Sequence, residues 1–390
     1  MPAGLYVHVP FCKRRCGYCD FYVETGKEAL FDRTVDAILR EAAREAGAWA
    51  GSCFDSLFVG GGTPSLLGRR RLGRLLDGLR DRLPLLSDAE ITIEANPEST
   101  DADLLAGLRA AGMNRLSLGV QSFADPELRL LDRLHDAARV RKVVEMARAA
   151  GVPQLSLDLI YGIPGTGAGA AWRQTLDEAI ALVPDHLSCY LLSLEERTPM
   201  GRRAARGELH LPGDAAARAF YDSARQRLEQ AGYEHYEISN WSRPGRVCRH
   251  NVNVWRGGVY LGLGPGAHGY DGTVRRANLP DLIGYLSGIE GGGIPPREEE
   301  RIDERRRFEE RLLLGLRLRE GVAWREIKGR FGEEAAEALR RAAAPWVDRG
   351  FLACDEERLR IEKEGWFVSN RLVGELITGA ESSGACRARP

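Results

Sequence analysis

Short apolar runs alternate with longer amphipathic stretches through the first half of the chain. The short runs, which are typical of strands, lie at 4–10, 56–62, 90–96, 115–122, 154–164 and 186–195. The stretches between them space their apolar residues as helices do and lie at 29–46, 70–83, 101–112, 137–151 and 170–183. Because parallel neighbours need a long connection, strands that alternate with helices pair in parallel. The pattern therefore predicts an α/β fold.

Right-handed crossovers curl a parallel sheet of this kind toward a (β/α) barrel. Six strands are too few for a closed eight-stranded barrel, so we expect a partial, open (β/α)6 TIM-like barrel over residues 1–235. A doubly wound sheet is the alternative that the same pattern allows.

The rhythm changes after residue 195. A helix is expected near 214–231, and residues 236–290 form a glycine- and aromatic-rich segment that we interpret as a connection. Residues 289–300 are interpreted as a linker. Residues 300–378 follow the order helix, helix, helix and small β-wing, which predicts a mainly helical, winged-helix-like C-terminal domain. Residues 379–390 are expected to be a flexible tail.

A winged helix suggests DNA binding, but the charges argue against it. The third helix, near 333–349, carries four acidic residues against three basic ones, and a helix this acidic repels phosphates. The whole chain has 55 basic and 56 acidic residues, which predicts no general attraction to nucleic acid or anionic lipid. We expect the C-terminal domain to serve packing or partner docking instead.

The sequence also indicates a compartment. No stretch approaches the ~20 apolar residues of a membrane-spanning helix, and residues 1–11 lead directly into a strand without the pattern of a signal peptide. Eight cysteines in 390 residues are too sparse for a disulfide framework. We expect a cytoplasmic protein, in which grouped cysteines indicate metal binding or catalysis.

Three cysteines, Cys12, Cys16 and Cys19, follow the first predicted strand. The spacing Cys-x3-Cys-x2-Cys can place three thiolates around one face of a 4Fe–4S cluster, which leaves the fourth iron open to an exogenous ligand. The alternative is a zinc ion, although no second cysteine or histidine pair has zinc-like spacing. Its fourth ligand would be one of Asp20, His8 and Cys53.

Polar and glycine residues gather where the predicted strands end, at Gly60–Thr63, Glu94–Asn96, Gln121 and Asp158. In parallel barrels the carboxyl ends of the strands form the rim that holds the active site. The cysteine loop falls at the same rim, so the sequence predicts one shared pocket.

The cysteine loop, with Tyr18 before the third cysteine, resembles that of the radical S-adenosylmethionine superfamily. The resemblance implies a partial (β/α)6 barrel and a 4Fe–4S cluster whose open iron is chelated by the methionyl amino and carboxylate groups of S-adenosylmethionine. The GGGTP segment at 60–64 resembles the part of that superfamily that contacts the amino group of the cofactor, and glycines there allow a close approach of the backbone.

A narrower resemblance covers essentially the whole chain. The segments LYVHVPFC, GGGTP, TIEANPE, RLSLGVQSF, LLDRLHDAARV and SLDLIYGIPG follow one another over residues 5–165. In this order they resemble the oxygen-independent coproporphyrinogen-III oxidase-like family, which includes the HemW haem chaperones. The resemblance implies that S-adenosylmethionine is contacted by Tyr6, Tyr18, Gly61, Gly62, Thr63, Glu94, Gln121, Arg133 and Asp158.

The residue types suit these roles, because carboxylates accept hydrogen bonds from ribose hydroxyls and an arginine pairs with a carboxylate. Ordinary structural roles remain as alternatives. Arg133 would then form a surface ion pair, and Glu94 or Asp158 would cap the following helix.

Two departures separate this chain from the oxidases it resembles. The oxidases have a fourth cysteine two residues beyond the third, where this chain has Phe21, and they carry an N-terminal extension before the first strand. The HemW chaperones share both departures. Their His-Asn-x-x-Tyr-Trp motif, associated with haem, corresponds here to 250–255, with Val254 in place of the tyrosine.

The resemblance implies His250 and Trp255 as haem-binding residues, with Cys248 and His268 as further candidates. We therefore expect a haem chaperone that binds a 4Fe–4S cluster, S-adenosylmethionine and haem, and that passes haem to an acceptor protein. An electron donor for the cluster is a further expected partner. The alternatives are an oxidase that decarboxylates coproporphyrinogen-III propionates to vinyl groups in haem biosynthesis, and another radical enzyme. Whether the chain is an enzyme stays open.

Overall fold

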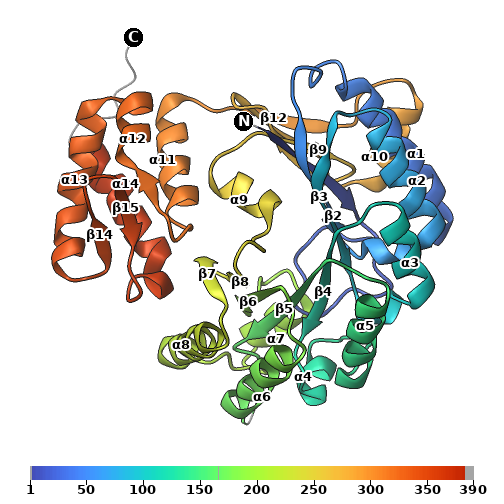
Figure 1. Cartoon of the computed structure of the whole chain (residues 1–390), viewed down its shortest axis with the longest axis horizontal. Coiled ribbons are helices and arrows are strands. Elements are labelled where there is room, and N and C mark those ends of the chain that lie inside the picture. The colour runs from blue at the N-terminus through green and yellow to red at the C-terminus, as the bar shows by residue number, and fades with distance from the viewer. Residues whose placement is uncertain (1, 166, 383–390) are drawn as a thin grey trace.

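Six parallel strands form the centre of the protein, which is described here from a computed structural model covering residues 2–165 and 167–382. The strands are β1 (Ala3–Val9), β2 (Phe54–Gly61), β3 (Leu85–Ala95), β4 (Arg115–Gln121), β5 (Gln154–Tyr161) and β6 (His186–Leu191). They pair in chain order from β1 to β6. Since every crossover advances in one direction, the sheet curls as a partial barrel, and the doubly wound alternative is wrong (Figure 1).

Helices cover the outer face of this sheet, as the sequence predicted (Figure 1). They are α1 (Phe31–Glu45), α2 (Gly68–Arg80), α3 (Ala102–Ala110), α5 (Ala137–Ala149) and α6 (Ala168–Ala181), with the short α4 (Asp125–Leu130) between β4 and α5. Short 3-10 turns, η1 (Glu28–Leu30), η2 (Pro64–Leu67) and η3 (Pro97–Ser99), precede α1, α2 and α3.

The two faces of the central strands differ in polarity. In β1, Leu5, Val7 and Val9 are fully buried against the helices, whereas Tyr6 and His8 line a cavity on the inner side. Successive side chains of a strand point to opposite faces. The same alternation along β3 to β6 gives the barrel an aliphatic outer layer and a polar inner surface, which is where ligands can be held.

Strands from the second half of the chain extend both edges of the sheet. Beyond β6 lie β8 (Asn240–Ser242) and β7 (Glu234–Glu237). Strand β8 pairs antiparallel with β6, and β7 pairs antiparallel with β8. On the other edge, β9 (Tyr260–Leu263) pairs in parallel with β1, followed by β10 (His268–Tyr270), β11 (Val274–Asn278) and β12 (Arg297–Arg301). The segment 236–290 thus contributes strands to the sheet and is not only a connection. The linker expected over 289–300 is wrong from residue 297, where β12 begins.

Helix α9 (Arg249–Trp255) occupies the inner side of the curved sheet, where it packs against β1 and β2 (Figure 1). The other helices of this region are α7 (Pro199–Ala205), α8 (Asp214–Gln230) and α10 (Leu282–Glu290). An internal helix narrows the barrel and places its own side chains on the cavity wall.

The C-terminal region has the winged-helix order that the sequence predicted. Its elements are α11 (Glu304–Gly315), β13 (Val322–Ala323), α12 (Trp324–Phe331), α13 (Glu333–Asp348), β14 (Leu352–Cys354), β15 (Arg358–Ile361), η4 (Trp366–Val368) and α14 (Ser369–Ser382). The small sheet has the order β13-β15-β14. Helix α14 includes the first four residues of the expected tail, so that prediction is wrong there; 383–390 lie outside the described residues.

Within residues 2–165 and 167–382, the structure contains no helix with the length and apolarity needed to span a bilayer.

Candidate functional site

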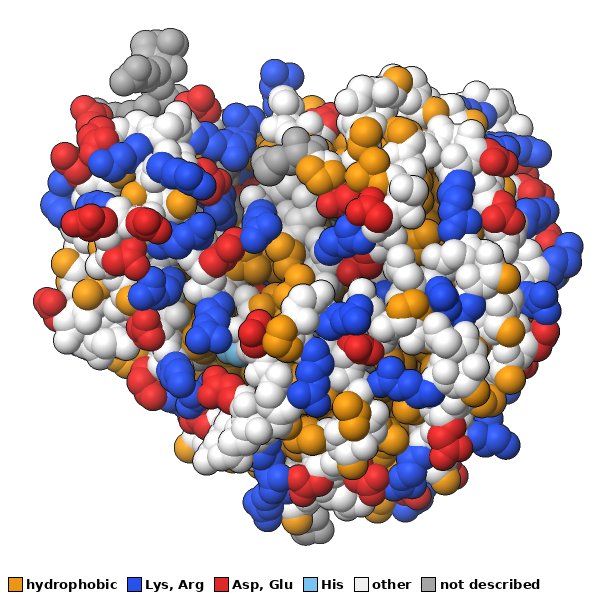
Figure 2. Space-filling view, in the orientation of Figure 1, with side chains coloured by type: hydrophobic (Ala, Val, Ile, Leu, Met, Phe, Trp, Pro, Cys, Tyr) orange, Lys and Arg blue, Asp and Glu red, His pale blue; other side chains and the backbone are white. Residues whose placement is uncertain are grey.

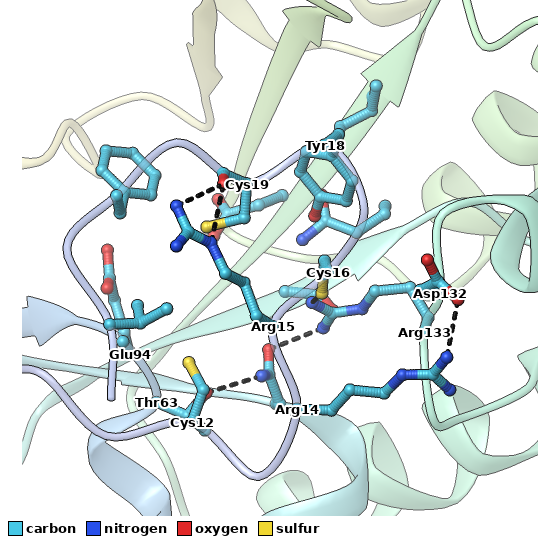
Figure 3. Close-up of a pocket in the computed structure, with 18 of the residues that line it drawn as sticks. Cys12, Arg14, Arg15, Cys16, Tyr18, Cys19, Thr63, Glu94, Asp132 and Arg133 are labelled. Atoms are coloured by element: carbon cyan, nitrogen blue, oxygen red, sulfur yellow. Dashed lines mark hydrogen bonds and ion pairs between the residues drawn. The ribbon is translucent and has the colours of Figure 1, made fainter. Parts of the chain in front are cut away.

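The three cysteines and the ends of β2 to β6 enclose a cavity of about 480 Å³. Figure 3 shows Cys12, Cys16 and Cys19 on the loop after β1, with Thr63, Glu94 and Arg133 beside them. The structure brings together on this cavity the three cysteines and Tyr18, Gly61, Gly62, Thr63, Glu94, Gln121, Arg133 and Asp158. Of the residues expected to contact S-adenosylmethionine, Tyr6 lies instead on a neighbouring cavity.

Backbone hydrogen bonds hold the cysteine loop against β2. Gly62 N donates to Val9 O at 2.9 Å and Thr63 N donates to Phe11 O at 2.7 Å. A Cβ atom at Gly62 would lie 2.6 Å from the Phe11 carbonyl oxygen, which no side chain tolerates. The loop is therefore seated directly on the glycine segment, and this contact requires a glycine at position 62.

A chain of side-chain hydrogen bonds joins two of the cysteines. Asn96 Nδ2 donates to Thr63 Oγ1 at 2.8 Å, and Thr63 Oγ1 lies 3.3 Å from Cys12 Sγ. On its other side, Asn96 Oδ1 accepts from Arg133 Nη2 at 2.6 Å, and Arg133 Nη1 donates to Cys16 Sγ at 3.5 Å (Figure 3). Asn96 therefore links the two halves of this hydrogen-bond network. The sequence placed it at the rim but gave it no role, because its two partners lie 33 and 37 residues away.

The thiols of Cys12 and Cys19 are held in their protonated form when no metal is bound. Burial raises the pKa of Cys12 to about 11, an effect that the hydrogen bond with Thr63 partly offsets. Burial also raises the pKa of Cys19. Because a metal is ligated by thiolates, binding at this site releases protons, and the positive charge of Arg133 favours that release at both cysteines.

The donor set fits a cluster better than a zinc ion. Among the described residues, no group of three His, Cys, Asp or Glu side chains surrounds a single metal-ion position. A cluster with one thiolate on each of three irons spaces its sulfurs more widely than one tetrahedral ion does.

None of the three residues considered as a fourth zinc ligand is available. Asp20 is paired with Arg197. His8 uses both ring nitrogens, with Tyr6 Oη at 3.0 Å from Nδ1 and the carbonyl oxygen of Tyr22 at 3.1 Å from Nε2. Cys53 is exposed and precedes β2, at the opposite end of that strand from the cysteine loop.

Two carboxylates, Glu94 on β3 and Asp158 on β5, face the cavity from the two sides of β4. Glu94 Oε2 accepts from Gly61 N at 3.1 Å, and Asp158 Oδ2 accepts from Ser117 Oγ at 3.0 Å. Burial, with a smaller contribution from Asp158, raises the pKa of Glu94 to about 7. Burial also raises the pKa of Asp158. Neither residue caps a helix, so the capping alternative is wrong.

Arg133 is not a surface ion pair. Its guanidinium donates to the carbonyl oxygen of Gly119 at 2.8 Å as well as to Asn96 and Cys16, so it faces the cavity. The surface ion pair is made by its neighbour Asp132, which accepts from Arg14 at 2.8 Å.

The backbone at the end of β4 is strained. Gln121 has a φ of 69°, in the left-handed region that favours glycine, and the pairing of β4 with β5 shifts register between Gly119 and Gln121. Such conformations cost of order 1–3 kcal/mol and persist where surrounding contacts hold them, often at functional sites. Here the irregularity turns Gln121 onto the cavity.

A second, larger cavity of about 1060 Å³ adjoins the first. The two cavities share lining residues, among them Arg15, Phe21, Glu94 and Tyr190. The wall of the larger cavity carries Tyr6, Phe58, His250, Trp255, Tyr260 and His268. Cys248 is not on this wall, because it is fully buried with its Sγ donating to Glu90 Oε1 at 3.4 Å. The structure therefore does not support Cys248 as a ligand in this cavity.

His250 lies at the first turn of α9 with its ring against the inner wall of the barrel. Its ring centre is 5.4 Å from that of Phe58 and 6.3 Å from that of Tyr6, and Nδ1 lies 3.4 Å from Ser56 Oγ. Burial lowers the pKa of His250 to about 4, so the imidazole is neutral at physiological pH. A neutral imidazole is the form that ligates a metal.

A buried carboxylate from the barrel holds the start of α9. Glu90, on β3, accepts from the backbone N–H groups of Arg249 at 3.1 Å and of His250 at 3.3 Å. These contacts satisfy N–H groups at the first turn of the helix, which have no partner within the helix itself. They fix the place of His250 on the cavity wall, and the sequence gave no signal for them.

Two sequence profiles match the chain: the Radical SAM superfamily over residues 6–170 and the HemN C-terminal domain over residues 302–368. A protein named heme chaperone HemW from Mycobacterium tuberculosis (strain ATCC 25618 / H37Rv) is 40% identical over 96% of this chain and 95% of its own length. Its namesake from Synechocystis is 38% identical over 98% of each chain.

A solved structure, coproporphyrinogen III oxidase (HemN) from Escherichia coli, superposes with a TM-score of 0.82 at 26% identity. The superposition covers 97% of this chain and 90% of that structure.

Proposed function

Because the chain belongs to the HemW family of radical SAM proteins, we propose that it is a haem chaperone, which binds haem and transfers it to an acceptor protein. The relatives bear this name over almost their whole length. One observation of the structure supports the proposal: a 1060 Å³ cavity, with His250 and Trp255 on its wall, adjoins the cavity of the three cysteines.

In this proposal Cys12, Cys16 and Cys19 hold a 4Fe–4S cluster, which supplies an iron with an open position and a source of single electrons. Thr63 and Arg133 donate hydrogen bonds toward the sulfur atoms of Cys12 and Cys16, and hydrogen bonds of this kind stabilise thiolate ligands. Asn96 keeps both donors in place.

S-adenosylmethionine is proposed to occupy the 480 Å³ cavity. Gly61, Gly62 and Thr63 are proposed to contact its methionyl part, and Glu94, Gln121, Arg133 and Asp158 to contact its two ends. Tyr18 packs beside the cavity against the apolar cluster that includes Leu131 and Ile160. Tyr6 is proposed to act from the larger cavity, where it separates His8 from His250.

Haem is proposed to occupy the larger cavity. The aromatic wall offers flat apolar surface to the porphyrin, and His250 offers a neutral imidazole to the iron. In this proposal the transferred haem is cargo rather than a resident cofactor. A haem acceptor protein and an electron donor for the cluster are the proposed partners.

The rival function is that of the structurally similar HemN, coproporphyrinogen III oxidase. Phe21 stands where the oxidases are expected to have their fourth cysteine, and its side chain is 69% exposed. An exposed phenylalanine offers no ligand to iron, which favours the chaperone.

Anaerobic reconstitution with iron and sulfide, followed by parallel titrations with haem and with coproporphyrinogen, tests the proposal. We expect a stoichiometric haem complex, transfer of its haem to an apo-haemoprotein, and no vinyl product from coproporphyrinogen. Vinyl formation in the presence of S-adenosylmethionine and of dithionite as the electron source, without haem transfer, would establish the oxidase instead. His250→Ala should weaken haem binding, whereas His210→Ala, on the surface between α7 and α8, serves as the matched control.

A further inference from the structure

Three arginines line the 1060 Å³ cavity, and two of them are already engaged. Arg197 is paired with Asp20, and Arg15 donates twice to the carbonyl oxygen of Cys19, at 3.3 Å each. The third, Arg317, makes neither a side-chain hydrogen bond nor an ion pair with any of the described residues. A guanidinium on a cavity wall whose N–H groups are not used in hydrogen bonds is a candidate binding group for an anion.

Arg317 comes from the C-terminal domain and is fixed in position by its backbone. It follows α11, and its carbonyl oxygen accepts from Ile238 N at 3.1 Å, in the hairpin between β7 and β8. The guanidinium carbon lies 4.6 Å from the centre of the Trp255 ring, a distance typical of a cation–π contact. The C-terminal domain thus supplies one side of the cavity, next to the end of α9.

The surroundings of Arg317 contain polar atoms that need a partner. Nε of Arg317 and Nε1 of Trp255 are buried donors without a hydrogen-bond partner among the described residues. Oε2 of Glu237 and Oδ1 of Asn240 are buried acceptors in the same condition. All four residues line this cavity. Since buried polar groups are almost always hydrogen-bonded, this corner of the cavity is built to receive a polar group.

We propose that Arg317 binds a carboxylate of the ligand in the large cavity, with the indole N–H of Trp255 as a second donor. The inference rests on the proposed function, under which the ligand is haem and the carboxylate is one of its two propionates. A planar guanidinium can give two parallel hydrogen bonds to a carboxylate, which a lysine cannot do. Arg317 would then set the orientation of the porphyrin relative to His250.

Glu237 allows a second test, in which haem affinity should change in the opposite direction. Its carboxyl group is fully buried and on the same wall, and Oε1 accepts from Ser239 N at 3.0 Å. Burial raises the pKa of Glu237 to about 7, and the positive charge of Arg317 partly offsets this effect. Above pH 7 the negative charge on Glu237 therefore opposes the binding of a second carboxylate nearby, and the titrations are made there. Removing that charge in Glu237→Gln should therefore strengthen the binding that Arg317→Gln weakens, while the contact with Ser239 is preserved.

The experiment compares haem with its dimethyl ester, in which both propionates are neutral, by anaerobic absorbance titration of the full-length protein. Arg317→Gln is expected to weaken haem binding about 10- to 100-fold, the usual range for a charged hydrogen-bonded contact, and to leave ester binding unchanged. Glu237→Gln is expected to tighten haem binding by a few-fold. Arg319→Gln is the matched control, because Arg319 is exposed and lines a different cavity; it should change neither affinity.

Equal loss of haem and ester binding in Arg317→Gln, or no loss at all, would overturn the inference. If thermal melting shows that Arg317→Gln does not fold, wild type and Glu237→Gln decide the question. Ester binding as tight as haem binding in the wild type, with no gain in Glu237→Gln, would also overturn it. A wild-type protein that binds no haem overturns the proposed function itself, which separates that failure from this one.

Discussion

The two adjoining cavities are built in different ways. The cysteine cavity is lined by residues that lie between 12 and 193 in the chain, and short hydrogen bonds such as those of Asn96 join its walls. The large cavity is lined by residues that lie between 6 and 317 in the chain, and its aromatic residues meet mainly through ring contacts. A hydrogen-bonded rim suits a group that stays, whereas a loosely joined aromatic wall suits a ligand that has to leave.

The strongest way to break this comparison is to remove the cluster site alone. Cys16→Ser takes away one of the three thiolates, so we expect loss of essentially all cluster iron after anaerobic reconstitution. Haem affinity should stay within about two-fold of wild type, because Cys16 does not line the large cavity. Iron and sulfide analysis together with a haem titration checks both statements.

The control for that variant is Cys53→Ser, which replaces an exposed cysteine away from the loop and should leave the iron content unchanged. A Cys16→Ser protein that loses haem binding as well would show that the two cavities are not independent.

The next largest effect concerns pH and the rim carboxylates. The pKa of Glu94 is raised to about 7 in the folded protein, so between pH ~4.5 and ~7 the folded state binds more protons than the unfolded state. Stability must therefore fall as pH rises through this window, by roughly 3 kcal/mol for this group. Glu94→Gln, which can still accept from Gly61 N, should remove that slope.

Urea unfolding of the metal-free wild type and of Glu94→Gln at several pH values measures the difference. A wild-type stability that is flat between pH 4.5 and 7 relative to the variant would contradict the raised pKa. Adding S-adenosylmethionine to the reconstituted protein should change this pH dependence, because the proposed ligand contacts the same carboxylate.

The third prediction concerns Glu41, whose buried carboxylate holds the turn that leads to His268 on the large cavity. Glu41, on α1, is buried and accepts from Gly264 N at 2.8 Å, from Tyr285 Oη at 2.7 Å and from Asn278 Nδ2 at 2.7 Å. Both carboxylate oxygens of Glu41 accept hydrogen bonds, so in Glu41→Gln the new NH2 group faces a hydrogen-bond donor. That donor loses its acceptor, which should lower the free energy of unfolding by about 2 kcal/mol. Haem affinity should fall with it, since these contacts position the turn that leads to His268.

Glu45→Gln, one turn further along α1, is the matched control. Glu45 pairs with Arg297 at 3.2 Å in a partly buried ion pair. Because Arg297 keeps Glu299 as a second partner at 2.8 Å, we expect a loss of about 1 kcal/mol in this control. A loss in Glu41→Gln that is no greater than this control would mean that the buried carboxylate does not hold the wall.

The smallest expected effect is that of Asn96→Ala. This variant keeps the side chains of Arg133 and Thr63 but removes the amide that positions both of them. We therefore expect about a ten-fold loss of S-adenosylmethionine affinity and unchanged haem affinity. Isothermal titration of the reconstituted protein measures the first, and absorbance titration the second. An equal loss of both affinities would show that Asn96 supports the whole barrel rather than the rim.

Much of the barrel followed from the sequence because its signals are local. Apolar runs with helical stretches between them gave the six central strands, and three cysteines within one loop gave the metal-binding hypothesis. The ends of those strands also gave the rim residues, since parallel strands bring their carboxyl ends to one edge.

Other features could not be read locally. The start of α9 is held by Glu90, β9 enters the sheet beside β1, and β12 forms in a segment interpreted as a linker. Each depends on partners 19 or more residues away in the chain. Cys248 sits in the motif region but faces Glu90 rather than the cavity, a direction that no spacing rule predicts.

The sequence by itself therefore determined the family, the six central strands and the three cysteines, because each is carried by neighbouring residues. Only the tertiary structure decided that Asn96 joins the cysteines and that Arg317, from the C-terminal domain, reaches the cavity of His250. The physical reason is that periodicity fixes which face of an element is apolar, whereas the packing of those faces against one another fixes which distant polar groups meet.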